Sequence, residues 1–438
     1  MQVDKTTLND LAIFHSEEEQ SVFHRLNFTT SDGGREWFRY FLAHPYTELN
    51  KIQETQQTLK LIIQSLHNWP ATITNGTVMV VDKFYDTPVE AIPSHPDPVS
   101  ALYYKIINAS DFSLVKYSVT HFIDFVKGLD RIVQVFASKN VPGLLQVMLD
   151  RILMLTNRPL IKDMMDWDKT RALKTADILT FGNYLKQHYK AAALELIDIY
   201  SKLDAYYGMA VACTKYNFAF PSIEKTSAPY IEAKNVHHLL VSQPVSYDVT
   251  LNQQSNFLFL TGANMAGKST FIKAVGITVY LAHVGMGVPA ENCKLSLFDG
   301  LLSNIQVEDN ISRGESYFFN EVQRIKKTVE KINDGRNWLI LIDELFKGTN
   351  IQDAMKCSTT VIEGVRKMHN ALFILSTHLY EIGEGLKKFP NISFKYFETL
   401  IEDGQLVFSY QLKEGISNDR LGYLILQREG VVKMLEDL

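Results

Sequence analysis

The segment TGANMAGKST, residues 261–270, combines two glycines, a lysine and two adjacent hydroxyls in a spacing that suits an anion. It fits the pattern G-x-x-x-x-G-K-[ST] from Gly262 to Ser269, after an apolar run at 256–260 and before a predicted helix. In that context the glycines let backbone N–H groups and a helix N-terminus approach phosphate oxygens. We expect Lys268 to reach the β- and γ-phosphates of a nucleotide and Ser269 to coordinate Mg²⁺. An accidental glycine turn is the alternative, and the flanking strand and helix argue against it.

Two adjacent carboxylates, Asp343 and Glu344, end a second apolar run at 338–342. Asp343 can hold magnesium through water, and Glu344 can orient or deprotonate an attacking water molecule. The alternative is that two acids simply end a strand at the solvent boundary. Together with the glycine loop, the pair favours a nucleotide hydrolase.

Two further residues allow two interpretations each. His378 follows a third apolar run, at 371–375, where it could sense a γ-phosphate, although a lone histidine is more often structural. Ser316 opens a predicted helix after a glycine turn, where it would face an anion or cap the helix. The residues alone leave both assignments open.

The composition is that of a globular protein. Its 438 residues, 46% hydrophobic and 21% charged, are enough for two or three domains. A net charge of −5 excludes a global basic field but leaves a local basic groove open. The N-terminus has no signal-peptide pattern, and the longest apolar stretch, at 271–288, is too interrupted to span a bilayer. We therefore expect a cytoplasmic protein with no membrane association, which fits three widely spaced cysteines: Cys213, Cys293 and Cys357.

The two halves of the chain differ in hydrophobic period. Apolar residues at alternating steps of three and four over 112–136 and 193–210 predict long packed helices. After residue 225, short β-rich runs separated by helical stretches predict a largely parallel sheet, with a late hairpin. The predicted fold is multidomain: an all-α domain at 1–225 followed by an α/β domain at 226–438.

Four segments, in this order and spacing, resemble the MutS family of DNA-repair ATPases, part of the ABC-type ATPase superfamily. They are TGANMAGKST, SRGESYFFNEV, LILIDELFKGTN and STHLYEI, and the Asn264-Met265 pair in the first is characteristic. Upstream, TTSDGGREWFRYFLAHPY is similar to the start of the family's core domain, and LDAYYGMAVACTKYNFAFP to its lever helix. The resemblance covers approximately residues 25–65 and 195–438.

The resemblance implies ATP and Mg²⁺ as cofactors of a P-loop ATPase. It implies that Asp343 and Ser269 serve the metal, and that Glu344 and His378 serve catalysis. Ser316 matches a serine that reaches the nucleotide of the opposite subunit, which implies a homodimer with two composite sites and C-terminal dimerisation helices. The residues expected to bind the nucleotide are Gly262, Asn264, Met265, Gly267, Lys268, Ser269, Thr270 and Ser316.

One departure from the family concerns mismatch recognition. The family's mismatch-recognition and connector domains precede the core, whereas about 25 residues do so here, so we expect a short member lacking them. Residues 70–190 show a helical pattern without the strands of a complete DNA clamp.

The principal interpretation is an ATP-dependent DNA-binding protein whose helical arms move on DNA, in mismatch repair or recombination-related maintenance. The alternative is a nucleotide-gated interaction protein that acts on a protein partner without DNA. A transporter subunit is a third interpretation, which would require membrane partners.

Overall fold

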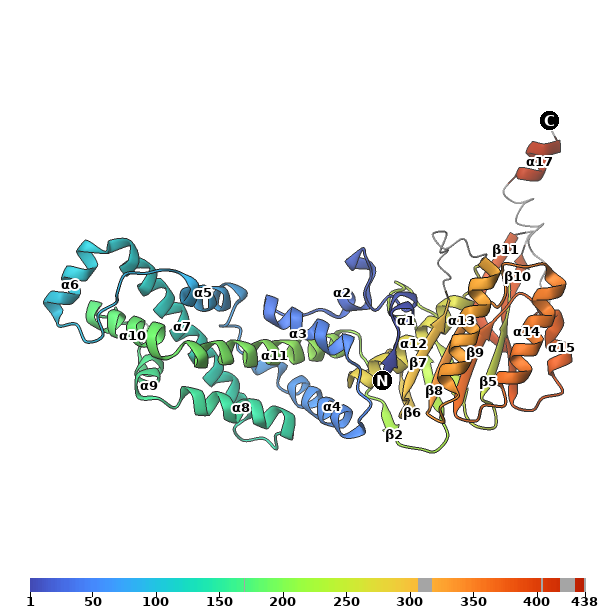
Figure 1. The fold of residues 1–438 in the computed structure, drawn as a ribbon, viewed down its shortest axis with the longest axis horizontal. Coiled ribbons are helices and arrows are strands. Elements are labelled where there is room, and N and C mark those ends of the chain that lie inside the picture. Colours follow the sequence, from blue (N-terminus) through green and yellow to red (C-terminus); the bar gives the residue numbers. More distant parts are fainter. Residues whose placement is uncertain (169, 306–316, 403–404, 418–429, 437–438) are drawn as a thin grey trace. The chain divides into compact units, whose positions relative to one another are not determined.

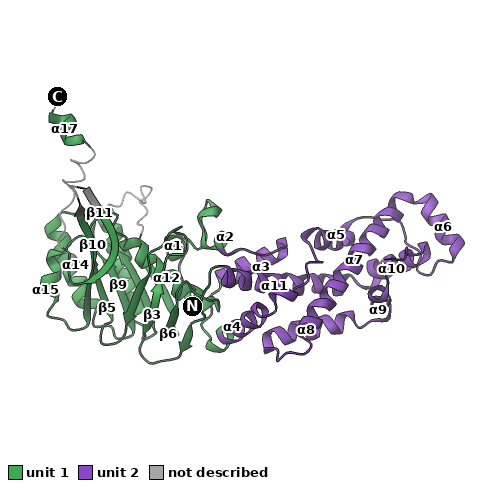
Figure 2. Ribbon diagram, turned by 180° about the vertical axis from the view of Figure 1, so that it is seen from behind, with its two compact units in different colours: residues 1–25, 44–52, 216–438 green, residues 26–43, 53–215 purple. Residues whose placement is uncertain are grey.

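The chain divides into two compact units. The computed structural model describes residues 1–168, 170–305, 317–402, 405–417 and 430–436 (Figure 1). Unit 1 comprises residues 1–25, 44–52 and 216–438, and unit 2 comprises residues 26–43 and 53–215 (Figure 2). Among the described helices, none combines the length and the apolar character needed to cross a bilayer.

Unit 2 is built from helices alone within its described residues. They are α3 (Asp32–Ala43), most of α4 (Leu49–Ile63), a 3₁₀ turn (Leu66–Asn68), α5 (Asn75–Asp86), α6 (Pro98–Ile107), α7 (Ala109–Phe136), α8 (Gly143–Thr156), α9 (Pro159–Asp166), α10 (Thr175–His188) and α11 (Lys190–Lys215). The two long stripes predicted from the sequence are confirmed as α7 and α11. Phe122, Val126 and Leu129 of the first stripe are fully buried, because the stripe forms the core-facing side of α7.

A buried carboxylate connects the first chain segment of unit 2 with its last helix. Asp204 of α11 accepts hydrogen bonds from the backbone N–H groups of Thr30 (3.0 Å) and Ser31 (2.8 Å), just before α3. The hydroxyls of both residues also donate to it, at 2.8 and 2.6 Å. Gly34 is required here, because an added Cβ would lie 2.0 Å from the Asp204 carboxylate. This contact explains the small and polar residues in the segment TTSDGG.

Unit 1 contains a seven-stranded sheet in the order β1-β7-β8-β9-β5-β10-β11. Its strands are β1 (Gln2–Val3), β7 (Gly300–Asn304), β8 (Trp338–Asp343), β9 (Ala371–Ser376), β5 (Phe257–Thr261), β10 (Ile392–Glu402) and β11 (Gln405–Glu414). Neighbouring strands are parallel from β1 to β10, and the last pair forms the predicted antiparallel hairpin. A second sheet has the order β2 (Ser222–Glu224), β6 (Asn292–Ser296), β3 (Ile231–Val236) and β4 (Tyr247–Leu251).

The described part of unit 1 also contains helices, several of which follow strands of this sheet. They are α1 (Lys5–Asp10), a 3₁₀ turn (Glu18–Gln20), α2 (Val22–Leu26), α12 (Lys268–Val284), α13 (Tyr317–Ile332), α14 (Ile351–Val365), α15 (Glu381–Leu386) and α17 (Val431–Glu436). Strands β5 and β9 are buried along their whole length, as expected for parallel strands covered on both faces. The loops after β5, β8 and β9 leave the same edge of the sheet, where open α/β sheets place their ligands.

The N-terminal segment departs from the predicted helical domain at 1–225. Residues 1–25 and 44–52 pack with the C-terminal part of the chain in unit 1. Strand β1 pairs in parallel with β7, and Asp10 of α1 accepts hydrogen bonds from Ser303 (2.5 Å) and from the backbone of Ile305 (3.0 Å). A two-residue strand carries no hydrophobic period, so its pairing could not be predicted from the pattern.

Candidate functional site

The glycine loop connects β5 to α12, and three of its residues have left-handed backbone. Their φ angles are +140° at Gly262, +67° at Met265 and +107° at Gly267. Glycine suits the first position because an added Cβ would lie 3.1 Å from the Phe397 backbone oxygen. Helix α12 starts directly at Lys268, so its N-terminus opens at the loop. The loop therefore brings free backbone N–H groups and a helix dipole to one place.

Lys268 is buried at the base of this loop. Its Nζ donates hydrogen bonds to the backbone oxygens of Gly262 and Ala263, both at 2.8 Å. Burial lowers the pKa of Lys268 to about 8, against the opposing attraction of Asp343 and Glu344. A cation held in this way is short of anionic partners, and a bound phosphate would supply them.

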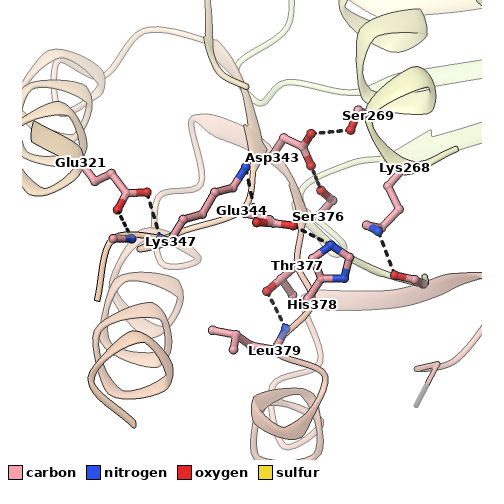
Figure 3. A network of polar contacts seen from close by, with 12 residues as sticks. Lys268, Ser269, Glu321, Asp343, Glu344, Lys347, Ser376, Thr377, His378 and Leu379 are labelled. Atoms are coloured by element: carbon pink, nitrogen blue, oxygen red, sulfur yellow. Dashed lines mark hydrogen bonds and ion pairs between the residues drawn. The ribbon is translucent and has the colours of Figure 1, made fainter. Parts of the chain in front are cut away.

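Asp343, the last residue of β8, accepts hydrogen bonds from two hydroxyls. The Ser269 hydroxyl donates to its Oδ2, and the hydroxyl of Ser376, at the end of β9, donates to its Oδ1 (Figure 3). Three chain segments thus meet at one carboxylate.

Glu344 has a left-handed backbone, with φ of +67°, and two basic neighbours. Its Oε1 lies 2.7 Å from Nε2 of His378, and its Oε2 lies 3.3 Å from Nζ of Lys347 (Figure 3). Burial raises the pKa of Glu344, but the hydrogen bond and charge of His378, together with Lys347, outweigh it and lower the pKa overall. Glu344 is therefore ionised at neutral pH and oriented from two sides.

A buried acid from α13 fixes the turn that follows Glu344. Glu321 accepts hydrogen bonds from the backbone N–H groups of Lys347 and Gly348, each at 3.1 Å (Figure 3). The ring of Phe346, which also has positive φ (+59°), packs 5.7 Å from that of Phe318 on the same helix. Left-handed backbone at bulky residues persists only where neighbours enforce it, and α13 supplies those neighbours here.

One cleft of about 580 Å³ is lined by Lys268, Ser269, Asp343, Glu344, Lys347 and His378. Its other walls include His238, Tyr247 and Tyr410, which give it a partly aromatic lining. Burial is the main reason why the pKa of His238 is lowered to about 4, so this ring is neutral at physiological pH. The cleft has the size and the mixed character of a small-molecule site.

Most of the residues singled out in the sequence meet at this cleft. Lining it are Asn264, Met265, Gly267, Lys268, Ser269, Thr270, Asp343, Glu344 and His378. Gly262 contributes a backbone oxygen to Lys268. Ser316 lies outside the described residues.

Three contributors were missed in the sequence: Ser376, Lys347 and Glu321. Ser376 stands two positions before His378 at a strand end, which is a usable signal for a site residue. Lys347 pairs with Glu344, which stands only three residues earlier in the chain. Glu321 acts through a contact across the fold, for which the local pattern offers no signal.

Comparison with known proteins matches residues 258–434 to the family described as MutS domain V. The chain is 29% identical to the DNA mismatch repair protein MutS of Pseudothermotoga lettingae over 233 residues, covering 52% of this chain and 28% of that protein. Identity to the protein of the same name from Lactococcus lactis subsp. cremoris is 27% over 255 residues (57% and 30% of the two chains). For that of Geobacillus kaustophilus it is 28% over 235 residues (53% and 26%). The chain thus matches less than a third of the length of these curated relatives.

Proposed function

Because the chain belongs to the MutS family, we propose that it is a Mg²⁺-dependent ATPase that works as a homodimer on DNA. The observation that carries the proposal is the meeting of Lys268, the Ser269–Asp343 pair and the Glu344–His378 pair in one cleft. Phosphoryl transfer to water needs a cation for the phosphates, oxygen ligands for a metal ion, and a group that orients the water.

Nucleotide binding rests on the glycine loop. Lys268 would exchange its two backbone carbonyl partners for phosphate oxygens, which would return its pKa toward the ordinary lysine value. The backbone between Gly262 and Thr270 would surround the phosphates, with Asn264 and Met265 on the cleft side. The aromatic wall formed with Tyr247 offers an apolar surface to the base.

The oxygen atoms of Ser269 and Asp343 fit Mg²⁺, which prefers hydroxyl and carboxylate ligands. Within the described parts of the chain, no group of three His, Cys, Asp or Glu side chains could hold a metal by itself. The ion would therefore take its other ligands from water and phosphate, as is usual for magnesium. When bound, it would neutralise charge developing on the phosphates.

Glu344 is the residue we assign to the attacking water. Its lowered pKa keeps the carboxylate ready to accept a hydrogen bond from water at neutral pH. His378, 2.7 Å away, would hold the carboxylate in place and, from the same position, face the γ-phosphate.

The helical part of the chain would serve as core and lever, and the α/β part as the ATPase. We propose that Ser316 completes the site of the opposite subunit, and that residues 348–350 and the C-terminal helices form the dimer seam. Dimerisation would make hydrolysis dependent on two chains, which allows ATP to move the helical arms on DNA in mismatch repair or related DNA maintenance. The cytoplasm suits this role, and the three cysteines are free thiols.

ATP hydrolysis by the purified protein, titrated with duplex, mismatched and branched DNA at low and moderate salt, tests this proposal. A rate changed by one DNA form, with the effect weakening as salt rises, is the expected result, because phosphate contacts release counterions. A rate indifferent to every DNA would instead favour a nucleotide-gated protein that acts on a protein partner. No hydrolysis above that of a Lys268→Ala variant would refute the ATPase itself.

A further inference from the structure

Helix α6 (Pro98–Ile107) in unit 2 exposes a continuous apolar stripe. Its members follow the steps of one helix face, and each is more than half exposed, up to 78% for Val99. The stripe consists of Val99, Leu102, Tyr103, Ile106 and Ile107. Isolated apolar residues on a surface are ordinary, but five on one face of a ten-residue helix form a patch that calls for a partner.

The helix that carries the stripe is firmly built. Asp97 caps it by accepting hydrogen bonds from the backbone N–H groups of Val99 (2.8 Å) and Ser100 (3.0 Å). Its opposite face is buried: Ala101 and Tyr104 are at most 5% exposed, and the Tyr104 hydroxyl donates to the Glu90 backbone oxygen. The stripe is thus presented by a fixed helix and has no place in the core of unit 2. Figure 2 shows α6 at one end of this unit, with α3 at the other.

The chemistry of the stripe excludes several partners. It contains no charged residue, and Lys105, the single cation of α6, lies with its Nζ 5.5 Å from the Phe112 ring. Nucleic acid would need lysines or arginines facing it, and the nearest ionised groups in sequence include the acids Asp97 and Asp111. A membrane-surface helix would carry basic residues along its polar face, which α6 does not. The partner must therefore offer an apolar helix-sized surface.

We propose that the stripe pairs with the same stripe of a second copy of this chain. A two-fold contact uses one patch twice, and this patch is self-complementary: aliphatic side chains lie on both sides of a central Tyr103. Covering the five side chains in both copies would remove on the order of 1,000 Å² from solvent, about the lower limit for a specific interface. The pairing lies outside the nucleotide site and adds a second point of contact to the dimer that the ATPase proposal requires.

Cysteine crosslinking without nucleotide tests the pairing directly. In a two-fold antiparallel pair of helices, the central residue lies closest to its own copy, so Tyr103→Cys should form a disulfide-linked dimer under mild oxidation. Lys105→Cys is the matched control, because it is exposed on the same helix about 200° around the axis from Tyr103. Both variants carry Cys357→Ser, since Cys357 is the partly exposed native thiol. Linkage of Tyr103→Cys at least tenfold faster than the control supports the pairing, and equal rates would overturn it.

Sedimentation of a charged variant separates this contact from the nucleotide-dependent one. Leu102→Asp/Ile106→Asp should weaken nucleotide-free association at least tenfold, whereas Lys268→Ala should leave it intact. Both substitutions lie at exposed positions, so we expect the double variant to fold. Circular dichroism and retained ATP binding check its folding. Unchanged association of the folded double variant would overturn the proposal. A second result would also overturn the proposal: the wild type binds anionic lipid vesicles, the double variant does not, and Tyr103→Cys forms no crosslink. Failure of ATP hydrolysis in the wild type would refute the proposed function without affecting either result.

Discussion

Replacement of Glu321 tests whether helix α13 holds the turn after Glu344 in the conformation that the proposed hydrolysis requires. The carboxylate is 3% exposed and accepts from two backbone N–H groups, of Lys347 and Gly348. Each hydrogen bond to a charged group contributes about 1.5–3 kcal/mol. Glu321→Ala therefore removes roughly 3–6 kcal/mol of support from the turn, by the same scale.

The backbone held by this support is strained. Positive φ angles at Glu344 and Phe346 each cost on the order of 1–3 kcal/mol. The lost support is comparable to that strain, so the turn should relax and carry the Glu344 carboxylate away from its position beside His378. If about 3 kcal/mol of transition-state stabilisation is lost, kcat falls roughly 100-fold.

The assay is steady-state phosphate release combined with equilibrium binding of a fluorescent ATP analogue. Glu321→Ala should lower kcat 10- to 100-fold and change nucleotide affinity less than threefold, because Glu321 does not line the cleft. Glu321→Gln keeps one carbonyl acceptor and should fall between that variant and the wild type. Glu330→Ala is the matched control: Glu330 lies on the same helix, is exposed, and within the described part of the chain pairs with Lys326 at i,i+4. A folded Glu321→Ala variant with kcat within threefold of the wild type would refute the reasoning.

Four other predictions concern the cleft itself. Glu344→Gln should bind ATP normally and release phosphate at least about 100-fold more slowly; unimpaired turnover would point to another residue as the base. His378→Ala removes the strongest group lowering the pKa of Glu344, so the acid limb of the pH–rate profile should move to higher pH, and an unmoved limb would contradict the contact. Lys268→Ala should weaken ATP binding about tenfold or more, because the phosphates lose a charged donor, and near-normal affinity in a binding titration would argue against its role. Because the folded pKa of Lys268 is lowered from 10.5 to about 8, the unfolded chain binds more protons between these values, and nucleotide-free protein should gain stability as pH rises through them, by roughly 3 kcal/mol. Denaturant titrations at several pH values should show that the free energy of unfolding rises with pH more steeply in the wild type than in Lys268→Ala. The same pH dependence in both proteins would show that burial does not destabilise the charged form of Lys268.

The parts of the site that could be predicted from the sequence are those coded locally. The loop from Gly262 to Ser269 is a contiguous pattern, and Asp343 and Glu344 end a strongly apolar strand, so both could be placed before the fold was known. Parallel strands then bring their C-terminal ends together, which is why His378 reaches Glu344.

The rest depends on contacts between distant segments. Glu321 lies 26 residues from Lys347 in the chain, and its role follows from burial beneath the turn rather than from its neighbours. In the same way, Asp204 and Ser31 are 173 residues apart. The sequence shows only an acid on one predicted helix and a serine before a second helix. Strand β1 is too short to show a period, so its place at the sheet edge depends on pairing with β7.

Mixing two variants that are each expected to be inactive tests the proposed composite dimeric ATPase most directly. Lys268→Ala removes the phosphate contact of one subunit, and Ser316→Ala removes the residue proposed to reach the partner's nucleotide. In a mixed dimer of the two, one site carries both changes and the other carries neither. Each variant alone should be inactive, and an equimolar mixture should recover about a quarter of wild-type hydrolysis, since half of the dimers are mixed and each has one intact site. A mixture as inactive as its components would contradict a site shared between two chains.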